Sequence, residues 1–271
     1  MTLSAWSRWA LRAFMAVGLT FIYVPLLLVL VNSFNGDRTF AWPPHDWTTR
    51  WWSAAWQNAG AREALATSVK AGLGATAIAL VLGTMVAFAV HRFTFFGRDA
   101  VSLLIVLPIA LPGIVTGIAL DSAWRSVIAP LGLGKGLFSV IVGHATFCVV
   151  IVYNNVLARL RRSGVSFEEA SSDLGASPFQ TFRHITFPLM RSALLAGGLL
   201  AFALSFDEII VTTFTAGPGI QTLPIWIFNN LFRPNQAPVV NLVAAALIVL
   251  SVLPVWLAQR LAGPEAGASR T

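Results

Sequence analysis

Residues 166–188 read SFEEASSDLGASPFQTFRHITFP, a stretch that carries the start and the end of a short helix. Ser166 and Glu169 have the spacing of a capping box, in which each side chain bonds the backbone amide of the other residue. Acidic side chains near the start of this helix also interact favourably with the positive end of its dipole. Gly175 can take the left-handed conformation that ends a helix. The pattern predicts a short, firmly capped helix that ends at Gly175.

A second helix is expected directly after the first one. Ser177 and Gln180 form another capping box, and Pro178 occupies the first helical position, where its missing N–H is not needed. Pro188 marks the next boundary. The two short helices carry several large apolar side chains, at Phe167, Leu174, Phe179, Phe182 and Ile185. Because such short helices are marginal in water, we expect them to pack on this chain's own helix ends or, as we favour, against a separate partner.

Long apolar runs lie on both sides of this stretch. The chain is 56% hydrophobic and 11% charged, whereas a soluble domain has about 25% charged residues. A helix needs about 20 mostly apolar residues to cross a bilayer, and lipid leaves helices as the natural form for such runs. We therefore expect an all-α membrane protein with six transmembrane helices, at residues 13–31, 71–90, 100–120, 136–158, 192–214 and 237–258.

The charged residues lie between the apolar runs. The chain has 18 basic and 11 acidic residues, and its Lys and Arg are more numerous on the side that is cytoplasmic if the N-terminus is inside. This bias predicts a multi-pass protein with both termini in the cytoplasm, and it explains the positive charge without nucleic acid. Residues 159–191 then form a cytoplasmic loop. The segment 32–70 lies outside, and its many Trp residues are typical of the membrane interface.

No linker or change of composition divides the chain. The apolar run at 13–31 is too long for a signal peptide and is expected to stay as the first span. We expect an N-terminal transmembrane helix with the Trp-rich outer segment (1–62), a core of five transmembrane helices (63–262) and a flexible C-terminal tail (263–271).

The cytoplasmic loop resembles the "EAA…G…I-LP" loop of binding-protein-dependent ABC importer permeases of type I. Glu169, Gly175 and Pro188 match that motif. Ser171 stands where the family usually has its second Ala, and Phe187 stands where it usually has Leu before Pro. The resemblance implies a six-helix permease fold with a cytoplasmic coupling helix between helices four and five.

The resemblance implies that this cytoplasmic loop docks on an ATPase subunit and couples ATP hydrolysis to transport. The residues expected to form it are Glu168, Glu169, Ala170, Asp173, Leu174, Gly175, Ala176, Ser177 and Pro188. The implied partners are a homologous second permease, two copies of a cytoplasmic ABC ATPase and a periplasmic substrate-binding protein, in the lipid of a bacterial inner membrane. The sequence has no phosphate-binding P-loop. We therefore expect a transport subunit that is no enzyme and holds no cofactor or metal, with ATP and Mg bound by the partner ATPase.

A second resemblance points to the cargo. Several segments are similar to the C-type subunit of spermidine/putrescine permeases, in the branch associated with putrescine and 4-aminobutyrate: residues 23–25, 32–35, 48–51, 204–211, 217–219 and 222–224. The likeness covers nearly the whole chain and implies import of polyamines or a related small amine. An amino acid, 4-aminobutyrate or an opine is the alternative cargo.

Acidic residues inside a membrane span are costly and are candidates for function. Asp207 and Glu208 fall within the fifth apolar run, Ser205 matches the family residue before its acidic pair, and Thr212 lies one turn beyond. A cationic amine stripped of water needs such oxygens. The alternative is that the acidic pair reaches the outer interface or pairs with a partner's Arg.

Two further candidates for the substrate path have a structural alternative. Asp121 can meet a cation, but Arg125 lies at the favourable i,i+4 ion-pair spacing, and we favour that pair. Trp51 can make a cation–π contact with an amine or can anchor the chain at the interface. Gly113 stands where amine-specific relatives often have an acidic residue, which weakens the case for a polyamine.

Two other classes of protein fit the sequence less well. An ion-driven secondary transporter usually has inverted repeats, and we find no repeat. A membrane enzyme needs a catalytic constellation, and none is apparent. His144 lies in an apolar run and is expected to be a hydrogen-bonded core residue.

Overall fold

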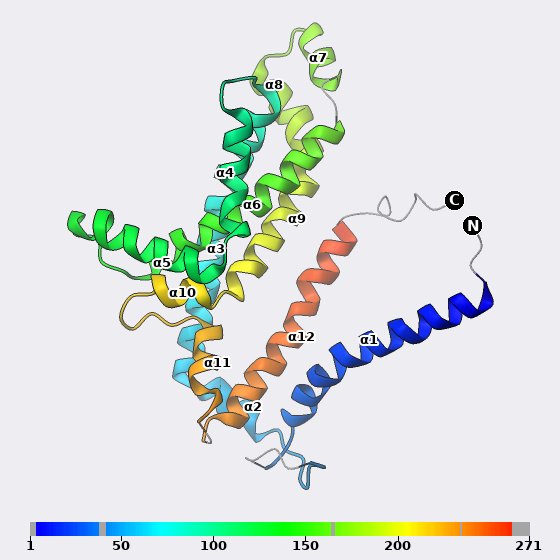
Figure 1. The fold of residues 1–271 in the computed structure, drawn as a ribbon, viewed down its shortest axis with the longest axis vertical. Helices are drawn as coiled ribbons and strands as arrows, with labels where there is room; N and C mark the ends of the chain where they lie inside the picture. Colours follow the sequence, from blue (N-terminus) through cyan, green and yellow to red (C-terminus); the bar gives the residue numbers. More distant parts are fainter. Residues whose placement is uncertain (1–3, 38–41, 164–165, 234, 262–271) are drawn as a thin grey trace. The chain divides into compact units, whose positions relative to one another are not determined.

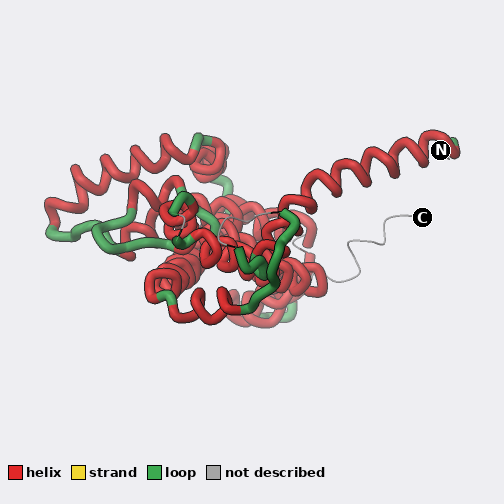
Figure 2. Tube along the Cα trace, turned by 90° about the horizontal axis from the view of Figure 1, so that it is seen from below, coloured by secondary structure: helices red, strands yellow, loops and turns green. Residues whose placement is uncertain are grey.

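The computed structural model describes residues 4–37, 42–163, 166–233 and 235–261. Over these residues the chain is nearly all helical (Figure 2). Extended pairing in this described part is limited to an isolated bridge between Asn35 and Trp47. The expected tail, 263–271, lies outside the described residues. The chain divides into two compact units, residues 1–62 with 226–253 and residues 63–225 with 254–271.

The first unit contains the two terminal helices. Its elements are α1 (Ala5–Asn32), α2 (Arg50–Gln57), most of α11 (Leu223–Leu231) and much of α12 (Ala237–Leu261). α1 is apolar, and none of its residues is buried within the protein, as expected for a helix whose sides face lipid. The side chain of Asn241 donates to the carbonyl of Val29 at 2.8 Å and ties α12 to α1.

The second unit packs around α6 (Leu137–Ser163), which contacts both α4 and α9 (Figure 1). The other helices of its bundle are α3 (Ala59–Arg92), α4 (Arg98–Ala110), α5 (Gly113–Ala123), α9 (Phe187–Phe206) and α10 (Ile210–Thr215). Small residues let the helices approach closely. A Cβ at Gly83 of α3 would lie 2.9 Å from the carbonyl oxygen of Val149, so only glycine allows this contact.

All six expected apolar runs are helical over most of their length. Within the described residues, five helices are long and apolar enough to cross a membrane, and Ala237–Leu250 is a shorter apolar helix. The five are Ala5–Asn32, Ala59–Arg92, Gly113–Leu131, Leu137–Ser163 and Pro178–Phe206.

The third run is not one continuous helix, which corrects the expectation for residues 100–120. α4 ends at Ala110, Leu111 has an extended backbone (φ −83°, ψ 146°), and α5 begins after Pro112. Proline disfavours the helical conformation of the residue before it and has no N–H to donate. α5 continues beyond Ala123 into the π-helical segment η1 (Trp124–Ile128).

The expectation of one continuous helix over residues 192–214 is also wrong near its C-terminal end. α9 ends at Phe206, and α10 begins only at Ile210. The carboxylate of Glu208 accepts a 2.8 Å hydrogen bond from the backbone N–H of Val211, which satisfies an amide that has no partner in the first turn of α10. Asp207 and Glu208 therefore lie in a break between two helices and not inside one.

Candidate coupling loop and substrate path

The first short helix of the loop is α7 (Ser166–Asp173), and it ends as expected at Gly175. Gly175 has a φ of +81°. Its N–H donates to the carbonyl of Ser172 at 2.9 Å, and the N–H of Ala176 donates to the carbonyl of Ser171 at 3.1 Å. These two bonds form a Schellman motif, the usual termination at a left-handed glycine. The capping box expected at Ser166 stays a prediction, because residues 164–165 lie outside the described part of the chain.

The second helix starts as expected but does not stop at Pro188. Ser177 and Gln180 exchange both bonds of the capping box, at 2.8 and 3.4 Å, and Pro178 opens α8 (Pro178–Thr181). The chain then passes through the π-helical segment η3 (Phe182–Thr186) straight into α9. A proline inside a regular α-helix leaves a carbonyl unpaired. The wider π turn accommodates Pro188, so the helix runs on as the fifth span.

Side-chain bonds hold α7 against the bundle. Glu168 accepts a 2.6 Å bond from the hydroxyl of Thr186 in η3 and forms an ion pair with Arg92 at the end of α3. The hydroxyl of Ser171 meets that of Thr181 in α8 at 2.9 Å. Ser171, the departure from the family's usual Ala, is thus buried and bonded. The α7–α8 segment (residues 166–181), called the elbow below, lies beyond the start of α4 and the end of α6 (Figure 1).

The tip of this elbow is apolar and exposed. Leu174 is 88%, Phe179 69% and Phe167 60% exposed. Phe182 does pack on the bundle, with its ring centroid 6.0 Å from that of Phe88 in α3. Glu169 and Asp173 are exposed on α7. The elbow therefore has one side hydrogen-bonded to the helix bundle and an opposite side that exposes apolar residues.

Two of the expected path residues lie inside the protein around His144 of α6. The ring nitrogens of His144 meet the hydroxyls of Ser205 and Thr212 at 2.7 Å each, and all three side chains are buried. The hydroxyl of Thr212 also meets the backbone carbonyl of Glu208 at 2.9 Å. The expectation that His144 is a hydrogen-bonded core residue is confirmed. The sequence did not reveal its partners, because they come from α9 and α10.

The acidic pair lies beside an open groove. Asp207 is exposed, and Glu208 is partly buried by its bond to the start of α10. The groove is lined by both carboxylates and four apolar residues, Ile151, Leu200, Ala203 and Leu204. Of the two acidic side chains, Asp207 is the more exposed one, whereas Glu208 already caps a helix.

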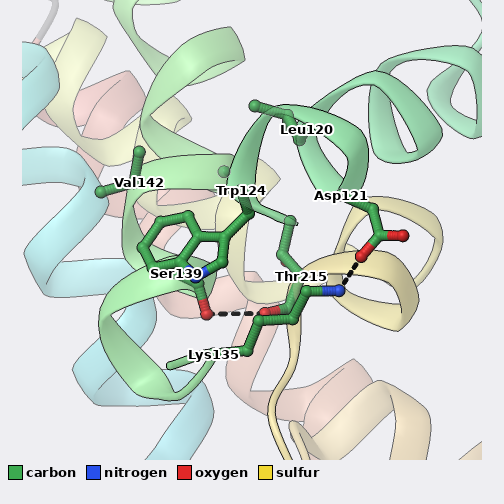
Figure 3. A pocket seen from close by; sticks show the side chains of 8 residues that line it. Leu120, Asp121, Trp124, Lys135, Ser139, Val142 and Thr215 are labelled. Carbon is green, nitrogen blue, oxygen red and sulfur yellow. Dashed lines mark hydrogen bonds and ion pairs between the residues drawn. The ribbon is translucent and has the colours of Figure 1, made fainter. Parts of the chain in front are cut away.

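Asp121 is neutralised by two basic side chains. Arg125 lies 2.9 Å from its carboxylate, so the favoured i,i+4 pair is confirmed. The Lys135 ammonium forms a second ion pair with it (Figure 3). The same ammonium donates to the carbonyl of Phe214 at 2.9 Å. Figure 3 shows Lys135 reaching from the segment before α6 to Asp121 of α5.

Trp51 is occupied by contacts within the first unit. Its indole N–H donates to the carbonyl of Asn35 at 2.8 Å, and the Arg50 guanidinium lies 4.4 Å from its ring centroid. The ring thus fixes α2 to the segment that follows α1 and already meets one cation.

Comparison with known proteins defines the class. The family model described as "Binding-protein-dependent transport system inner membrane component" matches residues 79–263. This chain belongs to that family: it is a permease subunit of an ABC importer. A solved bacterial ABC transporter involved in the import of the acidic polysaccharide alginate has the same fold, with a TM-score of 0.72 and 15% identity over 96% of this chain and 99% of that chain. The expected all-α type I importer permease fold is confirmed.

Two particular relatives are named for polyamines, as the sequence resemblance implied, and a third is named for 2-aminoethylphosphonate. The putrescine transport system permease protein PotI of Escherichia coli (strain K12) is 32% identical over 86% of this chain and 83% of its own length. The spermidine/putrescine transport system permease protein PotC of Haemophilus influenzae is 34% identical over 93% of this chain and 96% of its own length. The putative 2-aminoethylphosphonate transport system permease protein PhnV of Salmonella choleraesuis is 28% identical over 89% of this chain and 92% of its own length.

Proposed function

We propose that this permease moves polyamines, putrescine or spermidine, into the cell across the inner membrane. The observation that carries the proposal is the likeness of nearly the whole chain to permeases named for putrescine and for spermidine with putrescine. Each of these relatives is about as long as this chain, so the likeness is not limited to the shared core.

The acidic pair supports a cationic cargo. A protonated amine that leaves water needs oxygen ligands, because an unpaired charge in an apolar site is very costly. In this proposal Asp207 meets the amine in the groove, and Glu208 holds the start of α10 beside it. Ser205 of α9 and Thr212 of α10 do not contact the amine in this proposal. Their hydrogen bonds to His144 fix the position of α10.

The proposed transport cycle is alternating access, powered by other polypeptides. A periplasmic binding protein delivers the cargo to this chain and a homologous second permease. Two ATPase subunits bind ATP with Mg, close, and move the α7–α8 elbow. The exposed apolar tip at Phe167, Leu174 and Phe179 supports a docking role, since such side chains are otherwise poorly placed in water.

Reconstitution of the whole importer tests the proposal. The complex is placed in proteoliposomes, and ATP hydrolysis and uptake are measured with putrescine, spermidine or 4-aminobutyrate and the binding protein. We expect a polyamine to raise ATP hydrolysis and to be taken up, and to be displaced poorly by 4-aminobutyrate. Uptake of 4-aminobutyrate with no response to either polyamine would overturn the assignment.

Gly113 favours a second candidate cargo. Amine-specific relatives often have an acidic residue at this place, and glycine supplies no charge. A molecule with one amino group and one acidic group, such as 4-aminobutyrate, an amino acid or an opine, needs fewer carboxylates than a polyamine. Competition between these solutes and putrescine in the same vesicles separates the two candidates.

A further inference from the structure

Two neighbouring carboxylates of α7 have different surroundings. The side chain of Glu168 is only 17% exposed and is bonded on both oxygens, to Thr186 and to Arg92. Glu169, which matches the family motif, is exposed on the outer side of the same helix. Glu168 therefore points into this chain, whereas Glu169 is available to another protein.

Glu168 connects three elements that are far apart in sequence. It belongs to α7, its ion-pair partner Arg92 ends the span α3, and its hydroxyl partner Thr186 ends the π segment that leads into α9. A charge-assisted hydrogen bond is shorter and stronger than a neutral one, and the 2.6 Å distance from the Thr186 hydroxyl is of that kind.

An aromatic cluster continues the connection. The Arg92 guanidinium lies 5.5 Å from the centroid of the Phe88 ring, a cation–π distance. The Phe88 ring lies 6.0 Å from that of Phe182, which lies 6.2 Å from that of Phe187. Arg92 is thus held by a carboxylate of α7 and by a ring that packs on η3.

The space beneath this connection is nearly filled. The cavity there has a volume of about 10 Å³, about the minimum that a single water needs. Its lining includes Glu168, Thr186 and Met190 together with His91 at the end of α3. A displacement of α7 toward the bundle has little free volume in which to be absorbed.

We propose that Glu168 is a positioning residue that delivers the movement of α7 to α3 through Arg92 and to α9 through Thr186. This inference rests on the proposed function, because it assumes that an ATPase moves α7. It assigns separate tasks to the adjacent acidic residues: Glu169 faces the partner, and Glu168 is the internal tether. Loss of the tether leaves docking and ATP hydrolysis in place, but α7 then moves without moving α3 and α9.

Transport per ATP is the first measurement. Glu168→Gln, Arg92→Gln and the double variant are placed in the reconstituted complex. Each single variant should lower uptake per ATP hydrolysed about tenfold, the factor that one lost charge-assisted hydrogen bond supplies. The double variant should be no worse than either single one, because both changes remove the same interaction.

Matched controls neutralise charges at the same end of the bundle. Asp99→Asn removes an exposed carboxylate at the start of α4, and Arg161→Gln removes an exposed arginine at the end of α6. Both should keep the wild-type ratio of uptake to ATP hydrolysis. Equal ratios in Glu168→Gln and wild type, or losses of equal size in the controls, would overturn the tether and leave the proposed function intact.

Hydrogen exchange of the assembled complex tests the tether without any cargo. The amides of residues 166–173 should exchange about tenfold faster in Glu168→Gln and Arg92→Gln than in wild type or Asp99→Asn. Unchanged exchange contradicts the tether even if the complex proves to carry another solute. If the wild-type complex responds to no polyamine while the amides of α7 still exchange faster in these two variants, only the proposed cargo is contradicted.

Discussion

The Lys135 ammonium joins two helices at one point. It neutralises Asp121 of α5 and donates to the carbonyl of Phe214 near the end of α10. The last carbonyls of a helix have no partner within it and attract positive charge. Asp121 is therefore a structural anchor in this chain and not an open cation site.

Lys135→Met should destabilise this contact. It leaves a partly buried carboxylate with Arg125 alone and a helix-end carbonyl without its donor, so we expect a loss of roughly 2 kcal/mol of stability. Thermal unfolding of the purified complex measures it. Lys70→Met, at an exposed lysine of α3, is the control. An unfolding temperature equal to that of the control would show that the anchor contributes nothing.

Asp207 and Glu208 should respond differently to neutralisation. Asp207→Asn removes the exposed carboxylate of the groove, and we expect polyamine uptake to fall about tenfold or more, because a desolvated cation loses a charged partner. Glu208→Gln keeps an oxygen that can accept from Val211 and should fold normally. Uptake assays at several putrescine concentrations compare the two variants with wild type. Wild-type uptake by Asp207→Asn would remove Asp207 from the path.

At the scale of the elements, local signals in the sequence predicted much of the elbow. The turn at Gly175 and the start at Ser177 follow from capping chemistry within a few residues. The π segment before Pro188 and the break after Phe206 were not predicted, because hydropathy averages over such interruptions. Their causes are single residues, a proline without an N–H and a carboxylate that caps a new helix.

Contacts between side chains of different helices could not be predicted from the sequence. The pairing of Glu168 with Arg92 and the bonds of His144 to Ser205 and Thr212 join separate helices. No periodicity within one helix encodes such a partner, so the sequence could propose Ser205 and Thr212 for a path but could not place them in the core.

Gly175→Val should break the elbow without breaking the bundle. Valine is strained at a φ of +81°, at a cost of roughly 1–2 kcal/mol, and relief of this strain turns α8 away from α7. We expect the complex to assemble and hydrolyse ATP while uptake is lost. Gly132→Val, at another left-handed glycine (φ +83°) outside the elbow, is the control. Normal uptake by Gly175→Val at wild-type expression would show that the turn is not needed for coupling.

At the scale of the whole molecule, the distribution of Lys and Arg predicts the orientation. The elbow should lie in the cytoplasm with both termini, and the Trp-rich segment before α3 should lie outside. Single cysteines at Phe179 and Trp56, both exposed, test this in intact cells with a thiol reagent that does not cross the membrane. We expect labelling at position 56 and none at 179, and the reverse pattern would invert the topology.

The central claim is that another polypeptide drives this chain through its elbow. Cross-linking from Leu174→Cys tests it most directly, because Leu174 is the most exposed apolar residue of the tip, whereas the native Cys148 is buried. In the assembled importer we expect this thiol to cross-link to the ATPase subunit, and the yield to change when ATP binds. An importer that transports normally while position 174 reaches no ATPase in any nucleotide state would contradict the account.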